Sequence, residues 1–168
     1  MMNNIKIFVY GSCHYCSPKP GAYAVVVTVN GERQFHKTEG FTNTTHARMD
    51  ILGIIEGLSS ITDEGEIVIY LANDNVIHTI TKRWLENWKK KGFKKVKHQD
   101  LWLQVDQLLS RAKCEILFKN SREVWNDPNY AFVERLAKKT LHKLKLQGNV
   151  NPEGDRLIHS VSTEIKFI

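Results

Sequence analysis

The hydrophobic residues of this chain follow two spacings, and each spacing predicts a different element. Short apolar runs rich in β-branched residues predict strands, and apolar residues three and four positions apart, such as Ile51, Ile54, Ile55 and Leu58, predict helices. Strands are expected over residues 5–10, 23–29, 33–41, 66–71 and 114–119. Helices are expected from a cap at Thr44-Thr45 to Leu58, and over 76–81, 84–91, 100–109 and 129–146.

Turn and cap signals order these elements into one domain. Asn30-Gly31 is a strong hairpin signal, so the strand after it should return antiparallel to the strand before it. Asn73, Asp74 and Asn75 can cap the helix that follows them. With 168 residues, the chain can bury one core. The order βββ-α-β-α-α-α-β-α predicts an α/β domain over residues 1–146, and residues 147–168, without clear periodicity, are expected to form a C-terminal extension.

Charge adds to this picture because the basic residues cluster. Hydrophobic residues make up 42% and charged residues 25% of the chain, as in ordinary globular proteins. The formal charge is +6, and eight of the 24 Lys and Arg lie between residues 82 and 97 with one acid, Glu86. Such clustering indicates a site for a polyanion such as nucleic acid. No apolar run approaches the ~20 residues of a membrane span and no secretion signal is evident, so a cytoplasmic protein without a membrane partner is expected.

The cysteines suggest free thiols. Cys13 and Cys16 have the spacing of a zinc-binding pair, and Cys114 is the third cysteine. A structural zinc ion needs four ligands, and the sequence contains no second pair of this kind. Free thiols are therefore expected rather than a zinc site or a disulfide framework.

Four segments resemble motifs of the type 1 ribonuclease H family, in the family's order. Tyr10-Gly11-Ser12-Cys13 resembles its Asp-Gly-Ser motif at the end of the first strand, and residues 44–50 (Thr-Thr-His-Ala-Arg-Met-Asp) resemble Thr-Thr-Asn-Asn-Arg-Met-Glu at the start of its first helix. Residues 84–93, followed by Asp100-Leu101-Trp102, are similar to its basic protrusion and the next helix. Residues 128–137 resemble its last helix, with a carboxylate six residues after a proline.

The resemblance implies a ribonuclease H-like fold, a mixed five-stranded sheet of three antiparallel and then two parallel strands flanked by helices. It also implies the family's reaction, in which two Mg²⁺ ions about 4 Å apart hydrolyse the RNA strand of an RNA–DNA hybrid. A phosphodiester is an anion, so attack by water needs neutralised charge and an activated nucleophile. Four acids at one edge of the sheet hold the ions in the family, because magnesium prefers hard oxygen ligands.

At these four acid positions the chain departs from the family. Tyr10 stands where the family has the Asp that touches both ions, and a phenol is neutral near pH 7. Asp50 replaces a Glu, and Glu134 replaces an Asp. The third acid is expected at Asp74, with one residue deleted from the following helix, whereas an ungapped alignment puts Asn73 at this position.

The predicted catalytic and metal-binding residues are therefore Asp50, Asp74 and Glu134, with Tyr10 at the lost position. Residues 119–125 contain no histidine where the family has one that shuttles protons. The acids have alternative explanations, because Asp50 and Asp74 can simply stabilise helix starts and Glu134 can lie on a solvated helix face. Without the bridging acid, Mg²⁺ or Mn²⁺ is expected to bind weakly or not at all, and catalysis should be weak or absent.

The substrate-binding face resembles the family more closely. The predicted binding residues are Thr44, Thr45, His46, Trp84, Trp88, Lys89, Lys90 and Lys91. The first three lie where the family reads the minor groove, in which RNA is recognised by its 2′-hydroxyls. The tryptophans match an aromatic pair beside the DNA strand, with core packing as the alternative. The lysines resemble a protrusion that clamps phosphates, with a solvated charged face as the alternative.

Two functions follow from the resemblance and the departures. One is a protein that binds RNA–DNA hybrids, or double-stranded RNA, with a degraded two-metal site and little or no hydrolysis. The other is an active ribonuclease H, an endonuclease that cleaves RNA in hybrids with Mg²⁺ or Mn²⁺. A module that binds only proteins is disfavoured because the lysine cluster is retained.

Overall fold

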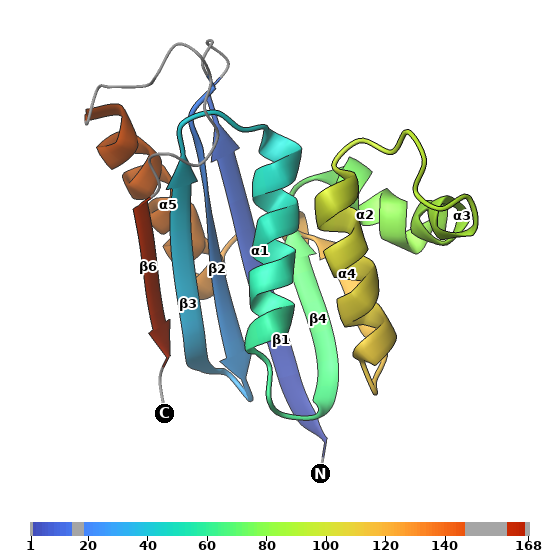
Figure 1. Cartoon of the computed structure of the whole chain (residues 1–168). Coiled ribbons are helices and arrows are strands. Elements are labelled where there is room, and N and C mark those ends of the chain that lie inside the picture. Colours follow the sequence, from blue (N-terminus) through green and yellow to red (C-terminus); the bar gives the residue numbers. More distant parts are fainter. Residues whose placement is uncertain (1, 15–18, 147–160, 167–168) are drawn as a thin grey trace.

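The fold is a mixed sheet with helices on both faces (Figure 1). The computed structural model describes residues 2–14, 19–146 and 161–166. Within this part of the chain the strand order is β5-β4-β1-β2-β3-β6. β1 pairs antiparallel with β2 and parallel with β4, so the antiparallel and parallel halves of the sheet meet at β1.

The elements follow the predicted order. The strands are β1 (Asn3–Cys13), β2 (Gly21–Val29), β3 (Glu32–Phe41), β4 (Gly65–Leu71), β5 (Ile116–Asn120) and β6 (Val161–Lys166). The helices are α1 (His46–Ser60), α2 (Asp74–Thr81), α3 (Trp84–Lys90), α4 (Gln99–Arg111) and α5 (Pro128–Leu146), with a 3₁₀ turn, η1 (Ser121–Val124), before α5. The five-stranded ribonuclease H-like sheet expected from the sequence is confirmed as β1 to β5.

Local chemistry explains the best-predicted boundaries. Thr45 is the N-cap of α1, and its hydroxyl accepts a hydrogen bond from the Arg48 backbone N–H at 3.2 Å. Asn30 and Gly31 turn from β2 into β3 with φ angles of +52° and +85°. Both residues adopt the positive φ that the favoured two-residue hairpin turn requires.

Alternation along β1 builds a core on each face of the sheet. Ile5, Ile7 and Val9 join the larger core beneath α1 and α4. Phe8 joins a smaller core beneath α5, and Tyr10 packs at the edge of this second core. Because successive side chains of a strand point to opposite faces, Tyr10 lies on the α5 side of the sheet.

The C-terminal segment differs from the expectation. β6, within the predicted extension of residues 147–168, pairs antiparallel with β3 from Phe35↔Lys166 to Gly40↔Val161 and adds a sixth strand to the sheet. No turn signal in the sequence marks β6 as a strand, and β3, the strand with which it pairs, lies more than 100 residues earlier.

Two other expectations concern the chain as a whole. Cys13 and Cys114 are not in disulfides among the described residues, and Cys16 lies outside them, so the absence of a disulfide framework and of a zinc site stays a prediction. Among the described helices, none has the length and apolar character needed to cross a bilayer. The cytoplasmic location stays a prediction.

Candidate functional site

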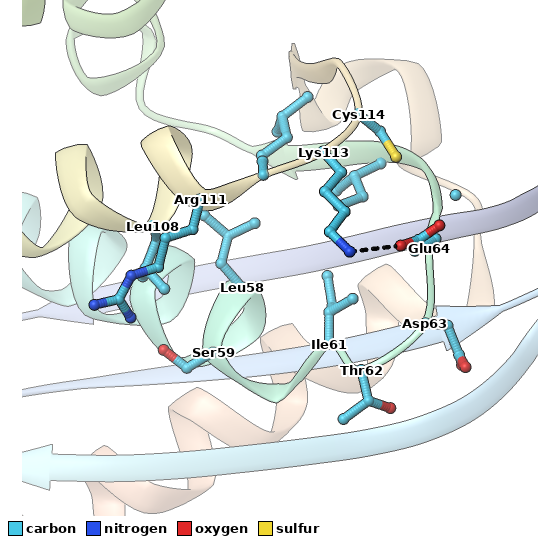
Figure 2. Close-up of a pocket in the computed structure, with 14 residues that line it drawn as sticks. Leu58, Ser59, Ile61, Thr62, Asp63, Glu64, Leu108, Arg111, Lys113 and Cys114 are labelled. Carbon is cyan, nitrogen blue, oxygen red and sulfur yellow. Dashed lines mark hydrogen bonds and ion pairs between the residues drawn. The ribbon is translucent and has the colours of Figure 1, made fainter.

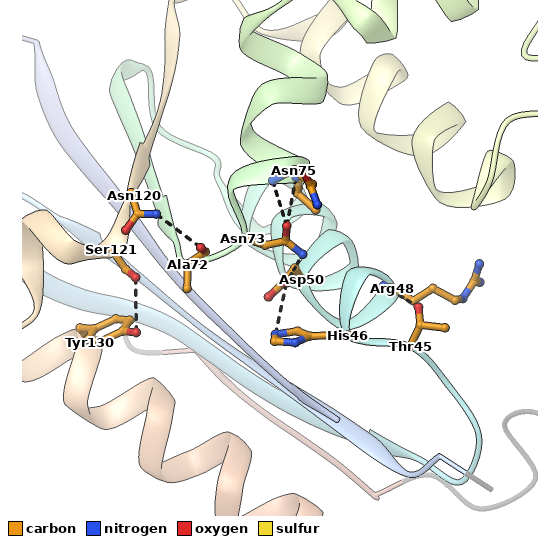
Figure 3. Close-up of polar contacts among 11 residues, drawn as sticks. Thr45, His46, Arg48, Asp50, Ala72, Asn73, Asn75, Asn120, Ser121 and Tyr130 are labelled. Carbon is orange, nitrogen blue, oxygen red and sulfur yellow. Dashed lines mark hydrogen bonds and ion pairs between the residues drawn. The ribbon is translucent and has the colours of Figure 1, made fainter. Parts of the chain in front are cut away.

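The residues at the family's acid positions come from four elements: Tyr10 from β1, Asp50 from α1, Asp74 from the start of α2 and Glu134 from α5. The structure divides them into three small groups rather than one cluster. Asp50 forms the first group with Asn73 and His46 (Figure 3). Tyr10 and Glu134 form the second with Lys138, and Asp74 belongs to the third.

Asp50 is buried and fully engaged by its neighbours. It sits in the second turn of α1 with 2% of its surface exposed. Its Oδ2 accepts a hydrogen bond from Asn73 Nδ2 at 3.1 Å and lies 3.5 Å from Nε2 of His46, one helical turn earlier. The Gly11 backbone N–H also donates to this carboxylate.

Gly11 permits this contact because it has no side chain. A Cβ at Gly11 would lie 2.5 Å from Asp50 Oδ1, closer than any side chain allows. The glycine of the Tyr10-Gly11-Ser12 motif therefore serves the close approach of β1 to α1 rather than a turn. The strand continues through it to Cys13.

Burial governs the charge of Asp50. Burial raises its pKa from 3.8 to about 6, while the adjacent His46 and the hydrogen bonds from Asn73 and Gly11 act in the opposite direction. Holding the carboxylate ionised at neutral pH thus costs free energy, because its neighbours offset only part of the lost hydration.

Tyr10 faces α5, and a lysine lies beside it. Lys138 Nζ is 2.7 Å from Glu134 Oε1, one helical turn earlier, and 5.8 Å from the centre of the Tyr10 ring. Tyr130 packs edge-on to Tyr10 at 6.2 Å between ring centres. Burial raises the pKa of the Tyr10 phenol further above neutrality, although the Lys138 ammonium opposes this shift. At pH 7 this position therefore presents a neutral aromatic ring.

Asp74, the residue preferred for the third acid, has partners other than Asp50. Its Oδ1 accepts a hydrogen bond from Asn120 Nδ2 at 2.8 Å, and Arg122 lies 3.8 Å from its Oδ2. Asn73 instead is the N-cap of α2, where its side chain accepts from the backbone N–H groups of Asn75 and Val76. The structure thus brings Asn73, the residue of the ungapped alignment, against Asp50.

This donor set does not fit two magnesium ions. Magnesium needs several oxygen ligands in near-octahedral geometry, and here the groups beside Asp50 are the Asn73 amide N–H and the His46 ring. Glu134 is paired with Lys138. In the part of the chain that the structure describes, no group of three or more His, Cys, Asp or Glu side chains could hold a metal ion.

The basic flank, defined as the eight Lys and Arg of residues 82–97, lies on and after α3, to the side of α1 away from α5 (Figure 1). All eight of these side chains are exposed. Lys89 pairs with Asp106 at 3.3 Å, and within the described ranges no other member of the basic flank forms an ion pair. Trp84 is 41% exposed, whereas Trp88 is half-buried against Trp102. Of the two predicted aromatic contacts, Trp84 is thus on the surface and Trp88 is partly a core residue.

The three predicted minor-groove residues differ in their accessibility. Thr44 is buried, and its backbone N–H donates to the Lys19 carbonyl at 2.8 Å. Thr45 is committed to capping α1. His46 has 54% of its side chain exposed and lies beside Asp50, so it is the member most open to a ligand.

A pocket of about 340 Å³ lies at the opposite end of the sheet (Figure 2). The C-terminal ends of α1 and α4 form it, and an exposed pair of Lys113 with Glu64 at 3.0 Å lies at its rim. None of the predicted site residues lines this pocket.

One participant in the site, Lys138, was missed from the sequence, and His46 was expected among the minor-groove residues but not beside Asp50. Lys138 follows Glu134 by four residues, and His46 precedes Asp50 by four, so each basic residue faces its acid across one helical turn. This spacing was a usable signal. Asn73 precedes Trp84 by eleven positions, the spacing of the ungapped alignment, and this was the signal for Asn73.

Comparison with known proteins gives a consistent result. The RNase H family model matches residues 2–140. Ribonuclease H of Oleidesulfovibrio alaskensis is 36% identical over 115 residues, which cover 66% of this chain and 73% of the relative. Ribonuclease H of Syntrophomonas wolfei is 34% identical over 134 residues, which cover 75% of this chain and 90% of the relative.

Solved structures share the fold at low sequence identity. LC9-RNase H1, a type 1 RNase H with the type 2 active-site motif, superposes with a TM-score of 0.66 at 15% identity, covering 95% of this chain and 77% of that one. The foamy viral protease-reverse transcriptase in complex with an RNA/DNA hybrid gives 0.64 at 15% identity, covering 83% of this chain and 20% of that one. With four motifs in order, this sheet and a family match over most of its length, the chain belongs to the type 1 ribonuclease H family.

Proposed function

We propose that this protein binds RNA–DNA hybrids along the edge of the sheet between α1 and α3, and hydrolyses the RNA strand weakly or not at all. The observation that carries the proposal is a contrast in charge. Asp50 and Glu134 each already have a basic partner on their own helix, whereas seven of the eight cations of the basic flank lack an ion-pair partner among the described residues.

Binding without hydrolysis follows from this contrast. Free cations on a surface gain affinity for a polyanion by releasing its counterions. Hydrolysis by two metals needs carboxylates that are available to hold them, and Tyr10 and Asn73 supply none. A solved structure that shares the fold, the foamy viral protease-reverse transcriptase in complex with an RNA/DNA hybrid, supports a hybrid as the ligand.

Active hydrolysis with Mg²⁺ or Mn²⁺ is the second candidate. It is favoured by the family match and by relatives named ribonuclease H. In this case a substrate phosphate would have to supply metal ligands that the chain lacks. Asp50 and Glu134 would be the carboxylates involved.

One pair of assays distinguishes the candidates. Fluorescence polarisation with a labelled hybrid, double-stranded RNA and double-stranded DNA, each in EDTA and in Mg²⁺, measures binding. Gel analysis of the same hybrid in Mg²⁺ and in Mn²⁺ measures cleavage. We expect hybrid binding in EDTA and cleavage at least about 1,000-fold slower than by the Syntrophomonas wolfei relative, as for loss of an essential catalytic group. A cleavage rate comparable to that of the relative would establish the second candidate. Tighter binding of double-stranded RNA than of the hybrid would show that double-stranded RNA is the preferred ligand.

A further inference from the structure

A groove beside Tyr10 has no role in the site described above. It has a volume of about 400 Å³ and lies between the end of β1 and the C-terminal half of α5. Ser12 and His14 line it on the β1 side, and Lys138, His142 and Lys145 line it on the helix side. We call these five residues and the space between them the α5 groove.

The α5 groove is basic because of the helical spacing of its residues. Positions 138, 142 and 145 follow one another at intervals of four and three, so they share one face of α5. All three side chains are exposed. No acidic residue lines the groove, and within the described chain neither His142 nor Lys145 has an ion-pair partner. Lys145 thus presents a free positive charge, and His142 and Ser12 add polar groups that can donate hydrogen bonds.

The α5 groove also connects to the candidate site. Lys138 lines the groove, and its Nζ lies 5.8 Å from the centre of the Tyr10 ring. A smaller hollow of about 120 Å³ shares Cys13 and His14 with the groove and extends to Lys19, Thr45 and His46. Figure 1 shows that the C-terminal half of α5 lies on the other side of the start of α1 from α3. Basic surfaces therefore flank the site on both sides.

From this arrangement we infer that the α5 groove binds backbone phosphates of the nucleic acid, on the side of the site opposite the basic flank. The inference rests on the proposed function, because it assumes that a duplex lies along this edge of the sheet. A phosphodiester suits the groove since two ammonium groups, two imidazoles and a hydroxyl line it, and Glu134, the acid paired with Lys138, is not among the lining residues. The contact needs no divalent ion, because Lys145 supplies an unpaired positive charge and the Lys138 ammonium, which Glu134 partly neutralises, adds N–H donors.

α5 itself offers a matched control. Lys139 and Lys143 are exposed like Lys138 and Lys145 but lie about 100° or more around the helix from them. They do not line the groove. Removing either pair changes the net charge equally. Because Lys138→Ala alone would free the Glu134 carboxylate, all variants carry Glu134→Gln, and E134Q serves as their parent.

Binding of a labelled hybrid in EDTA, measured across a series of salt concentrations, tests the inference. We expect the variant with Lys138→Ala and Lys145→Ala to bind about 10- to 60-fold more weakly than its parent at 0.1 M salt, with a salt slope lower by up to about 1.8. The variant with Lys139→Ala and Lys143→Ala should stay within about threefold of the parent. Circular dichroism and melting curves check that the variants are folded.

Two other outcomes would overturn the inference. Equal losses from both lysine pairs would mean that only net charge matters, and no loss from the groove pair would mean that the groove is not a contact. A parallel variant with Lys89, Lys90 and Lys91 changed to Ala separates this failure from that of the proposed function. If the basic-flank variant loses affinity while the groove variant does not, only the inference that the α5 groove binds phosphates is wrong. If neither loses affinity, the proposed binding edge is wrong as well.

Discussion

The centre of the site and its basic flank differ in how their charges are balanced. At the centre, the carboxylates of Asp50 and Glu134 each lie within 3.5 Å of a basic side chain one helical turn away. On the basic flank, Lys89 has an acidic partner and the remaining seven cations are exposed without one among the described residues.

Whether a charged side chain already has a partner of opposite charge decides how strongly it attracts a metal ion or a phosphate. A carboxylate that already has a basic side chain beside it has less to gain from a metal ion, because the ion must displace or oppose that side chain. Unpaired surface cations retain their full attraction for phosphates, which weakens with salt. The comparison therefore separates two properties that usually occur together in a nuclease, affinity for the substrate and affinity for the catalytic metal.

Rebuilding the centre should give the largest effect. The variant with Tyr10→Asp and Asn73→Asp would restore carboxylates beside Asp50 and Glu134, so we expect hybrid cleavage in Mg²⁺ to rise by about 1,000-fold or more. Each single substitution should stay within about tenfold of the wild type, because the groups act as a unit. Gel-based cleavage assays measure the rates.

Charge and steric relief must be distinguished in this experiment. Tyr10→Asn with Asn73→Asp removes the ring without adding the first carboxylate. If this control cleaves as fast as the double Asp variant, relief of the ring rather than restored charge is responsible. If the double Asp variant binds hybrids but does not cleave them, the damage extends beyond these two positions, and the longer side chain of Glu134 and the missing histidine become the next candidates.

Removing charge from the basic flank should have the next largest effect. Changing Lys89, Lys90 and Lys91 to Ala should weaken hybrid binding by roughly 100-fold at 0.1 M salt and lower the salt slope by up to about 2.7, or 0.9 per lost contact. Polarisation assays measure both. Arg111→Ala with Lys113→Ala, at the opposite end of the sheet, is the control and should have little effect. Unchanged affinity in the lysine variant would indicate a merely solvated face.

The buried carboxylate predicts a pH-dependent stability effect of intermediate size. The pKa of Asp50 is about 6 in the folded protein against 3.8 for an ordinary Asp. Between these values the folded state holds more protons than the unfolded state, so stability falls as the pH rises through this window. Asp50→Asn should therefore raise the free energy of unfolding by on the order of 2–3 kcal/mol at pH 7.5 and have almost no effect near pH 4.

Urea unfolding of both proteins at several pH values tests this expectation. The gain should develop between about pH 4 and pH 6, following the titration of the carboxyl group. A variant less stable than the wild type at pH 7.5 would show that the contacts of Asp50 with Asn73, Gly11 and His46 outweigh the cost of its burial.

The features that were predictable from the sequence depend on local chemistry. Thr45 caps α1 through a residue three positions away, and Asn30-Gly31 turns the β2–β3 hairpin by its own backbone preferences. Both could be identified without knowledge of the fold. The four motifs then identified the sheet, because their order along the chain matches that of the family.

The features that were missed depend on long-range contacts. Choosing between Asn73 and Asp74 requires the position of Asp50, which comes from another element. β6 becomes a strand by pairing with the edge of β3, more than 100 residues earlier, and its own sequence carries little signal. The four-residue spacing predicts that Lys138 pairs with Glu134, but the position of Lys138 beside Tyr10 depends on the packing of β1 against α5.

Metal binding should give the smallest change in the wild type. If Mg²⁺ binds with a dissociation constant of 10 mM or weaker, 10 mM Mg²⁺ stabilises the protein by at most about 0.4 kcal/mol. For a chain of this size that raises Tm by about 1 °C. The variant with Tyr10→Asp and Asn73→Asp should gain several times more, because it adds two carboxylates to the site. Scanning calorimetry of both proteins without nucleic acid, with CaCl₂ as a second ion and NaCl at matched ionic strength as the control, measures the shifts. Two results would contradict this expectation: a rise of more than about 4 °C in the wild-type Tm in Mg²⁺, or two well-populated sites by titration calorimetry. Either would show that Asp50 and Glu134 release His46 and Lys138 readily. The charges at the centre of the site would then be as available to a ligand as those of the basic flank.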